Sequence, residues 1–136
     1  MNSTTDTTTT CNHAEFPSAS IQRKPWGYET IFAGGEHGYA AKIITVHRGH
    51  SLSLQLHSRK DETLYILEGT AEVEHGTDVN TLSTTTLTAG DIVHLPPRIL
   101  HRVTATTDLT FAEASTAGPG WREDITRLRD SYGRTG

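Results

Sequence analysis

The chain has few of the residues that build disulfide frameworks, membrane spans or nucleic-acid interfaces. Its 136 residues include one cysteine, Cys11, which excludes an internal disulfide and a cysteine-based zinc site. No apolar run approaches the roughly 20 residues of a membrane span, and the first eleven residues show no signal-peptide core. The net charge of −4, from 12 basic and 16 acidic residues, argues against nucleic-acid and anionic-membrane partners. These absences predict a soluble, cytoplasmic domain.

Polar residues are concentrated at the N-terminus. Six of the first ten residues are threonine, and no periodic apolar pattern occurs before Phe16. We therefore expect residues 1–20 to form a disordered tail. Residues 21–136 are numerous enough to close one hydrophobic core, and we expect them to form a single domain.

Short apolar or alternating runs recur after Ile21, and turn-forming residues separate them. Runs of four to eight residues with β-branched and aromatic side chains are typical of strands. Such runs occupy residues 39–46, 52–57, 64–67, 71–74, 92–95, 100–105 and 109–114. Because helical periodicity is almost absent, this pattern predicts an all-β antiparallel sandwich or barrel.

The C-terminal stretch Arg122–Tyr132 has a different periodicity. Ile125 and Leu128 are three residues apart, and Tyr132 lies four residues beyond Leu128, as on one stripe of a helix. Acidic residues begin the stretch and arginines follow, which suits the helix dipole. We therefore expect a short C-terminal helix.

Four residues with metal-ligating side chains occur at suggestive positions. Gln55 and His57 alternate with leucines, so they share one face of a strand, separated by roughly 7 Å. Glu62 follows five residues later, and His101 heads another strand after a Pro-Pro turn. These oxygen and nitrogen donors suit Zn, Mn, Fe, Co or Ni. The combination predicts a site for one divalent metal ion and leaves the identity of that ion open.

The spacing resembles the two motifs of the cupin superfamily. Residues 49–69 read G-HSLSL-Q-L-H-SRKD-E-TLYILE-G, similar to the first motif with Gln55 in place of a histidine. Residues 90–101 read G-DIVHL-P-P-R-IL-H, similar to the second motif, where Arg98 replaces a glycine and Ala105 an asparagine. The resemblance implies a cupin fold, which is a double-stranded β-helix or jelly-roll barrel. It also implies four metal ligands: Gln55, His57, Glu62 and His101.

A closer resemblance is to the cupin domain of type II mannose-6-phosphate isomerases, usually fused to a mannose-1-phosphate guanylyltransferase. The Gln-x-His of that family occurs at 55–57, and its Arg-Pro-Trp-Gly opening is similar to residues 24–27. Its C-terminal pattern is similar to residues 123–127 and 132–134. The similarity covers residues 22–134.

This resemblance implies a metal-dependent isomerase acting on a small anionic metabolite, such as the sugar phosphate mannose 6-phosphate. The metal would polarise a carbonyl, and a base would move a proton between neighbouring carbons. Glu113 is the candidate catalytic base, because its strand is expected to face the cavity. Lys42, Arg102 and Arg134 are candidates for binding the anionic group of the substrate. The resemblance also favours a homodimer.

Two departures from the family pattern concern the substrate. Lys60 stands where the family usually has arginine, and residues 113–115 read Glu-Ala-Ser in place of Glu-Val-Gln. Three other functions therefore stay open. They are a metal-cupin oxygenase or rearrangement enzyme of secondary metabolism, a non-catalytic small-molecule-binding cupin, and a metal-free sugar-nucleotide epimerase.

Overall fold

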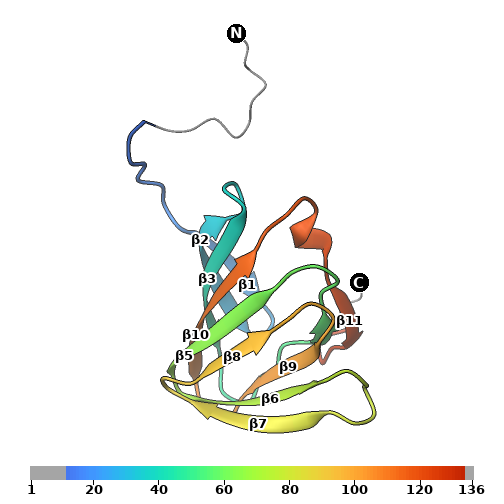
Figure 1. The fold of residues 1–136 in the computed structure, drawn as a ribbon. Coiled ribbons are helices and arrows are strands. Elements are labelled where there is room, and N and C mark those ends of the chain that lie inside the picture. The colour runs from blue at the N-terminus through green and yellow to red at the C-terminus, as the bar shows by residue number, and fades with distance from the viewer. Residues whose placement is uncertain (1–11, 134–136) are drawn as a thin grey trace.

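Two antiparallel sheets face each other in the computed structural model, which describes residues 12–133 (Figure 1). The first sheet has the strand order β1-β2-β3-β10-β5-β8, and the second has the order β11-β4-β9-β6-β7. The strands are β1 (Ser20–Lys24), β2 (Gly27–Gly34), β3 (Tyr39–Val46), β4 (Leu54–Leu56), β5 (Glu62–Glu68), β6 (Thr70–Gly76), β7 (Ser83–Thr88), β8 (Ile92–Leu95), β9 (Leu100–Ala105), β10 (Leu109–Thr116) and β11 (Thr126–Arg129).

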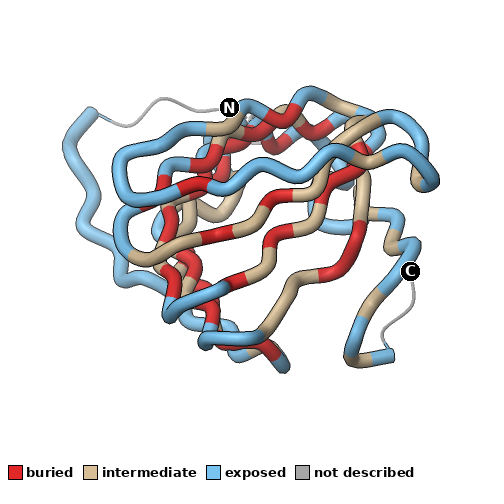
Figure 2. Tube along the Cα trace, turned by 90° about the horizontal axis from the view of Figure 1, so that it is seen from below, coloured by how far each residue is buried: buried red, intermediate tan, exposed pale blue. Residues whose placement is uncertain are grey.

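The core lies between the inner faces of the two sheets. Ile44 and Phe111 from the six-stranded sheet belong to one cluster with Val73 and Val103 from the five-stranded sheet, and each is at most 3 % exposed. Buried and less buried positions alternate along β10 and along most of β9. Figure 2 shows the same alternation of red with tan or blue along strands of the fold. This period of two gives each strand one buried face, and burying it is the main force that holds the sheets together.

The glycines that end the first motif and begin the second occupy turns with a positive φ. Gly69, between β5 and β6, has φ +90°, and a Cβ there would lie 2.1 Å from the carbonyl oxygen of Asp108. Gly90 has φ +94° but no atom within 4 Å of a Cβ. Gly69 is therefore required by both backbone conformation and space, whereas Gly90 is required by conformation alone.

The predicted all-β antiparallel fold is confirmed. The runs at 39–46, 92–95 and 100–105 match β3, β8 and β9 residue for residue. Residues 1–11 of the predicted tail lie outside the described residues, and residues 12–19 are exposed and form no strand. Within residues 12–133, no helix has the length and apolar character needed to cross a bilayer.

The predicted helix over Arg122–Tyr132 is wrong. Only Trp121–Glu123 is helical, as a single turn of 3-10 helix, and β11 follows it. Arg127 of β11 pairs with Gln55 of β4, so the backbone groups of this stretch complete the edge of a sheet. That pairing outweighs the weak preference of the four residues of β11 for a helix, because tertiary contacts routinely override local propensity.

Candidate metal centre

A cavity of about 290 Å³ lies between the sheets, beside the 3-10 turn and β11. This volume is at the lower end of the range for small-molecule sites, so it suits a small metabolite. Both sheets contribute polar side chains to the lining. The charged, amide, imidazole and indole side chains among the lining residues include Glu29, Lys42, Gln55, His57, Lys60, Glu62, His101, Glu113, Trp121 and Arg127.

Three of the predicted ligands converge inside the cavity. The Nε2 atoms of His57 and His101 lie 3.1 and 3.2 Å from the same oxygen, Oε2 of Glu62. All three residues are buried, and within residues 12–133 that oxygen has no hydrogen bond of acceptable geometry. Ligands about 2.1 Å from one ion at octahedral or tetrahedral angles are roughly 3.0–3.4 Å apart. The oxygen and each of the two nitrogens are therefore as far apart as two ligands of a single divalent ion, and all three atoms lie within 4.8 Å of one another.

The other ring nitrogen of each histidine fixes its tautomer. Nδ1 of His57 lies 2.7 Å from the carbonyl oxygen of Asp124, and Nδ1 of His101 lies 3.0 Å from that of Ile99. A carbonyl oxygen can only accept, so each Nδ1 carries the hydrogen. Nε2 is then the ring nitrogen left to bind a metal ion, and it lies on the side facing Glu62. This is the arrangement by which second-shell carbonyls orient metal-binding histidines.

The charge of Glu62 also suits a ligand. Burial works to raise the pKa of Glu62, but its contacts with His101 and His57 and the nearby Lys60 ammonium outweigh burial. The pKa is therefore held well below its usual range, and the side chain is a carboxylate, the form that binds a metal ion.

Gln55 lies on the same face as the other ligands. It pairs with His101 across β4 and β9, which places the two side chains on one side of the sheet. Its amide nitrogen donates to the carbonyl oxygen of Ser53 at 3.4 Å, and it lines the cavity. The amide oxygen is the atom that a divalent ion would use. Ligation by Gln55 stays a prediction.

A group of buried charges surrounds the three ligands. Nζ of Lys60 lies 2.9 Å from Glu113 and 3.6 Å from Glu62. Burial lowers the pKa of Lys60, but the two carboxylates outweigh it and leave the pKa raised. The pKa of Glu113 is raised by burial and by the charge of Glu62, and the lysines offset this only in part. Nearby, Lys42 forms an ion pair with Glu29 at 3.2 Å.

The 3-10 turn supplies an aromatic wall. The cationic groups of Lys42, Lys60 and Arg122 lie 5.6, 5.9 and 4.7 Å from the ring centre of Trp121, within the range of cation–π attraction. A Cβ at Gly35 would lie 2.5 Å from the indole nitrogen, so the β2–β3 turn must carry a glycine for the ring to dock.

Of the other predicted site residues, some line the cavity and some do not. Glu113 and Lys42 line the cavity, opposite each other across β10 and β3. Arg102 is not among the residues that line this cavity, so the structure does not support its predicted role in binding substrate there. It binds Glu74 at 2.7 and 3.1 Å, because neighbouring residues of a strand face opposite ways and His101 points inward. Arg134 lies outside the described residues.

Sequence reasoning missed three residues of the cavity as site residues. In the sequence, Lys60 differs from the family pattern but carries no sign that it lies close to the ligands. Trp121 carried no local signal, because its role depends on a distant turn. Arg127 was assigned to a helix, and only its pairing with Gln55 brings it to the cavity.

Comparison with known proteins agrees with this geometry. Residues 42–112 match the cupin domain family. Xanthan biosynthesis protein XanB of Xanthomonas campestris is 34% identical over 115 residues, 82% of this chain and 23% of that protein. Alginate biosynthesis protein AlgA of Pseudomonas putida is 34% identical over 131 residues, which are 94% of this chain and 24% of that protein. The mannose-1-phosphate guanylyltransferase of Escherichia coli is 30% identical over 114 residues, which are 82% of this chain and 22% of that protein. The chain thus spans under a quarter of each of these relatives.

Solved structures share the fold at low identity. An oxalate decarboxylase of Bacillus subtilis superposes with a TM-score of 0.73 at 17% identity, covering 90% of this chain and 34% of that chain. The capsular polysaccharide assembling protein CapF of Staphylococcus aureus superposes with a TM-score of 0.69 at 16% identity, covering 85% of this chain and 35% of that chain. The resemblance to cupins is confirmed by these matches together with the two-sheet fold. The chain, with His57, Glu62 and His101 inside its matched region, belongs to the cupin family.

Proposed function

We propose that the protein is a metal-dependent isomerase of a small sugar phosphate, with mannose 6-phosphate as the first substrate to test. The observation that carries this proposal is the buried set of His57, Glu62 and His101. The ion pair of Lys60 and Glu113 lies beside that set in the same small cavity. The name of the Escherichia coli relative, a mannose-1-phosphate guanylyltransferase, supports a substrate of the mannose phosphate class.

One divalent ion, of Zn, Mn, Fe, Co or Ni, would be held by the three buried ligands and Gln55. When bound, it would supply Lewis acidity to a carbonyl and its neighbouring hydroxyl. The chain itself prepares the site: Glu62 is anionic, and the imidazoles present Nε2 because their Nδ1 atoms bind main-chain carbonyls.

Glu113 is the residue that we propose moves the proton. It lies on β10 between Lys42 of β3 and Leu64 of β5, and all three line the cavity. Because burial and the charge of Glu62 raise its pKa, its carboxylate is a stronger base than an exposed glutamate and can return the proton it takes. The Lys60 ammonium, 2.9 Å away, orients the carboxylate by a hydrogen bond.

Arg127 replaces Arg102 as the candidate for binding the anionic group. Its Nε is buried, and no hydrogen-bond partner within residues 12–133 satisfies it. Arg127, Gln55 and His101 form one register row over β11, β4 and β9. Two strand spacings, roughly 9–10 Å, therefore separate the backbones of Arg127 and His101. A substrate with a carbonyl at the metal end and a phosphate several carbons away matches this separation.

A homodimer is the assembly that we propose, and the outer face of the six-stranded sheet is the surface for it. One register row across this sheet reads Thr30, Ile43, Ala112, Tyr65 and Ile92, and none of these residues is charged. Tyr65 is 43% and Ile92 64% exposed. Exposed apolar side chains on an uncharged face are a feature of protein contact surfaces. Light scattering should give twice the chain mass, and Ile92→Lys should give the monomer mass. A wild-type monomer at high concentration would refute the dimer.

The activity test is isomerisation of mannose 6-phosphate, followed by coupled detection of the ketose phosphate. We expect turnover that depends on added divalent metal and is lost in Glu113→Gln. The matched control is Glu68→Gln, since Glu68 is an exposed glutamate on neighbouring β5 that does not line the cavity. Metal-loaded wild-type protein that converts neither mannose 6-phosphate nor related aldose phosphates would refute the isomerase.

A second candidate, an Fe(II)-dependent oxygenase, is favoured by one observation. Two histidines and one carboxylate form the ligand set that non-haem iron oxygenases use. Oxygen uptake by the Fe(II)-loaded protein on addition of a small organic acid, without isomerisation, would favour this reading over the isomerase.

A further inference from the structure

We propose that Asp124 is a positioning residue that couples the C-terminal strap, residues 121–129, to the metal ligand His57. Metal binding and docking of the strap would then favour each other. The inference rests on the metal site of the proposed function and adds to it a control of metal affinity from a distant part of the chain.

One residue of the strap holds four consecutive residues of the β4–β5 loop. The Asp124 carboxylate accepts from the backbone nitrogens of Ser58 at 2.8 Å, Arg59 at 2.9 Å and Lys60 at 3.0 Å. Its main-chain oxygen accepts from Nδ1 of His57 at 2.7 Å. The loop lies 64 to 67 residues away in the sequence, so this is a long-range tertiary clamp.

The clamp supplies hydrogen bonds that the loop cannot make by itself. Residues 57–61 form no strand, so no sheet ladder satisfies their amides. Unpaired amides are costly in a folded protein, and a carboxylate that accepts three of them defines the loop geometry tightly. His57 begins this loop and Glu62 follows it, so the geometry of the loop sets the relative placement of two ligands.

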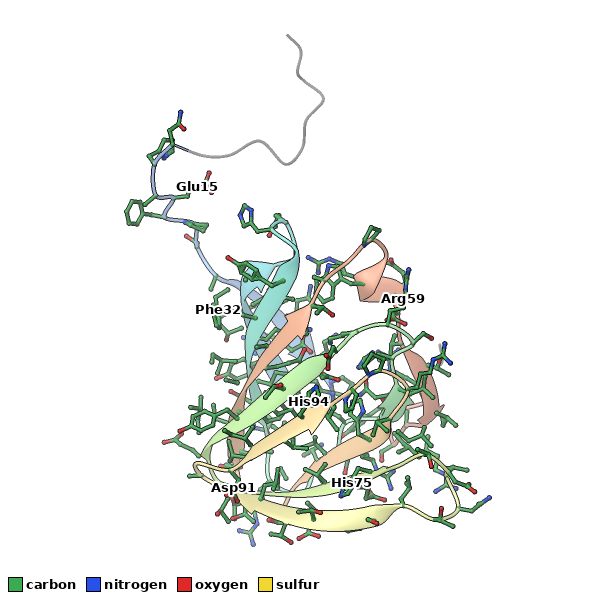
Figure 3. The ribbon with its side chains drawn as sticks, viewed as in Figure 1. Glu15, Phe32, Arg59, His75, Asp91 and His94 are labelled. Carbon is green, nitrogen blue, oxygen red and sulfur yellow. The ribbon has the colours of Figure 1, made fainter. Side chains whose placement is uncertain are left out.

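The strap contacts the site at other points as well. β11 pairs Arg127 with Gln55, and Trp121 lies over the cavity lysines. Arg59 donates to the carbonyl oxygen of Pro119 at 3.2 Å, just before the 3-10 turn (Figure 3). A docked strap therefore holds His57 ready for metal, and by linkage a bound metal must stabilise the docked strap to the same extent.

The experiment compares Asp124→Asn with the control Glu123→Gln in the full chain. Glu123 is the exposed neighbour with the same charge, so both variants lose one negative charge at the strap. We measure the Kd for Co²⁺ by chelator competition, and the visible absorption of the bound Co²⁺. Asp124→Asn should bind on the order of 10- to 100-fold more weakly and with an altered spectrum, as for other second-shell changes. Glu123→Gln should match the wild type in both.

Equal Kd values and spectra in Asp124→Asn and the wild type would overturn the inference alone. A second arm uses only the wild-type protein and does not depend on the folding of a variant. Added Co²⁺ should slow hydrogen exchange at the amides of residues 58–60 and 126–129, and exchange there that is unchanged by bound Co²⁺ would also overturn the inference. Wild-type protein that binds no divalent metal would instead refute the proposed function, and the inference with it.

Discussion

Lys60→Met removes the only cation that contacts both Glu113 and Glu62 among the described residues. At an effective dielectric constant of about 20, the attractions at 2.9 and 3.6 Å are about 6 and 5 kcal/mol before desolvation is subtracted. Removing one partner of a buried ion pair typically costs about 3–5 kcal/mol, because the other charge is left buried. Since Lys60 is 8% exposed, we expect a loss in that range.

The assay is urea unfolding in the presence of a chelator, so that bound metal does not contribute to stability. With a slope of about 2 kcal/mol per molar, the midpoint of Lys60→Met should fall by about 2 M. Lys24→Met is the matched control, since Lys24 makes no ion pair in the described part of the chain, and it should shift by under about 0.5 kcal/mol. Adding Glu113→Gln to Lys60→Met should recover at least about 1 kcal/mol relative to additivity. A midpoint like that of the wild type would refute a stabilising role for the buried pair.

Three further predictions concern residues that are not proposed metal ligands. Arg102→Ala should leave the KM for mannose 6-phosphate unchanged and lower the free energy of unfolding by about 0.5–1 kcal/mol. Because Arg102 lowers the pKa of Glu74, this contribution is present above the ordinary glutamate pKa of about 4.3 and is lost as the pH falls below it, as thermal unfolding from pH 3 to 7 should show. Gly69→Ala should destabilise at least twice as much as Gly90→Ala, for which we expect about 1–2 kcal/mol. Phe111→Ala should cost about 3–5 kcal/mol by urea unfolding.

The strands were predictable because they follow local rules, and the ligand cluster was predictable because its residues match the two cupin motifs. A period of two and turn residues define most of the strands, and the spacing of residues 55–62 brings two ligands and their loop together. The same period could have excluded Arg102, since it is adjacent to an inward-facing histidine. Its charge beside a ligand suggested substrate binding, whereas its position on the strand assigns it to the outer face.

The C-terminal segment was not predictable from its own residues. An acidic residue at the start of the stretch suggested a helix N-terminus, but the Asp124 carboxylate binds amides of a loop 64 to 66 residues away. Ile125 lines the cavity while Leu128 is 44% exposed, so the apparent stripe does not face one surface. The placement of Trp121 and Arg127 depends on this docking, which local periodicity does not encode.

The most direct test of the central claim is the metal content of protein purified without a histidine tag, measured by mass spectrometry. The wild type should hold close to one divalent ion per chain, and His57→Ala and Glu62→Ala should hold almost none. His94→Ala is the control, because His94 is a 58% exposed histidine on β8 that pairs with Asp61, and it should keep its metal (Figure 3). Wild-type protein that neither contains a divalent ion nor takes one up on reconstitution would contradict the metal centre.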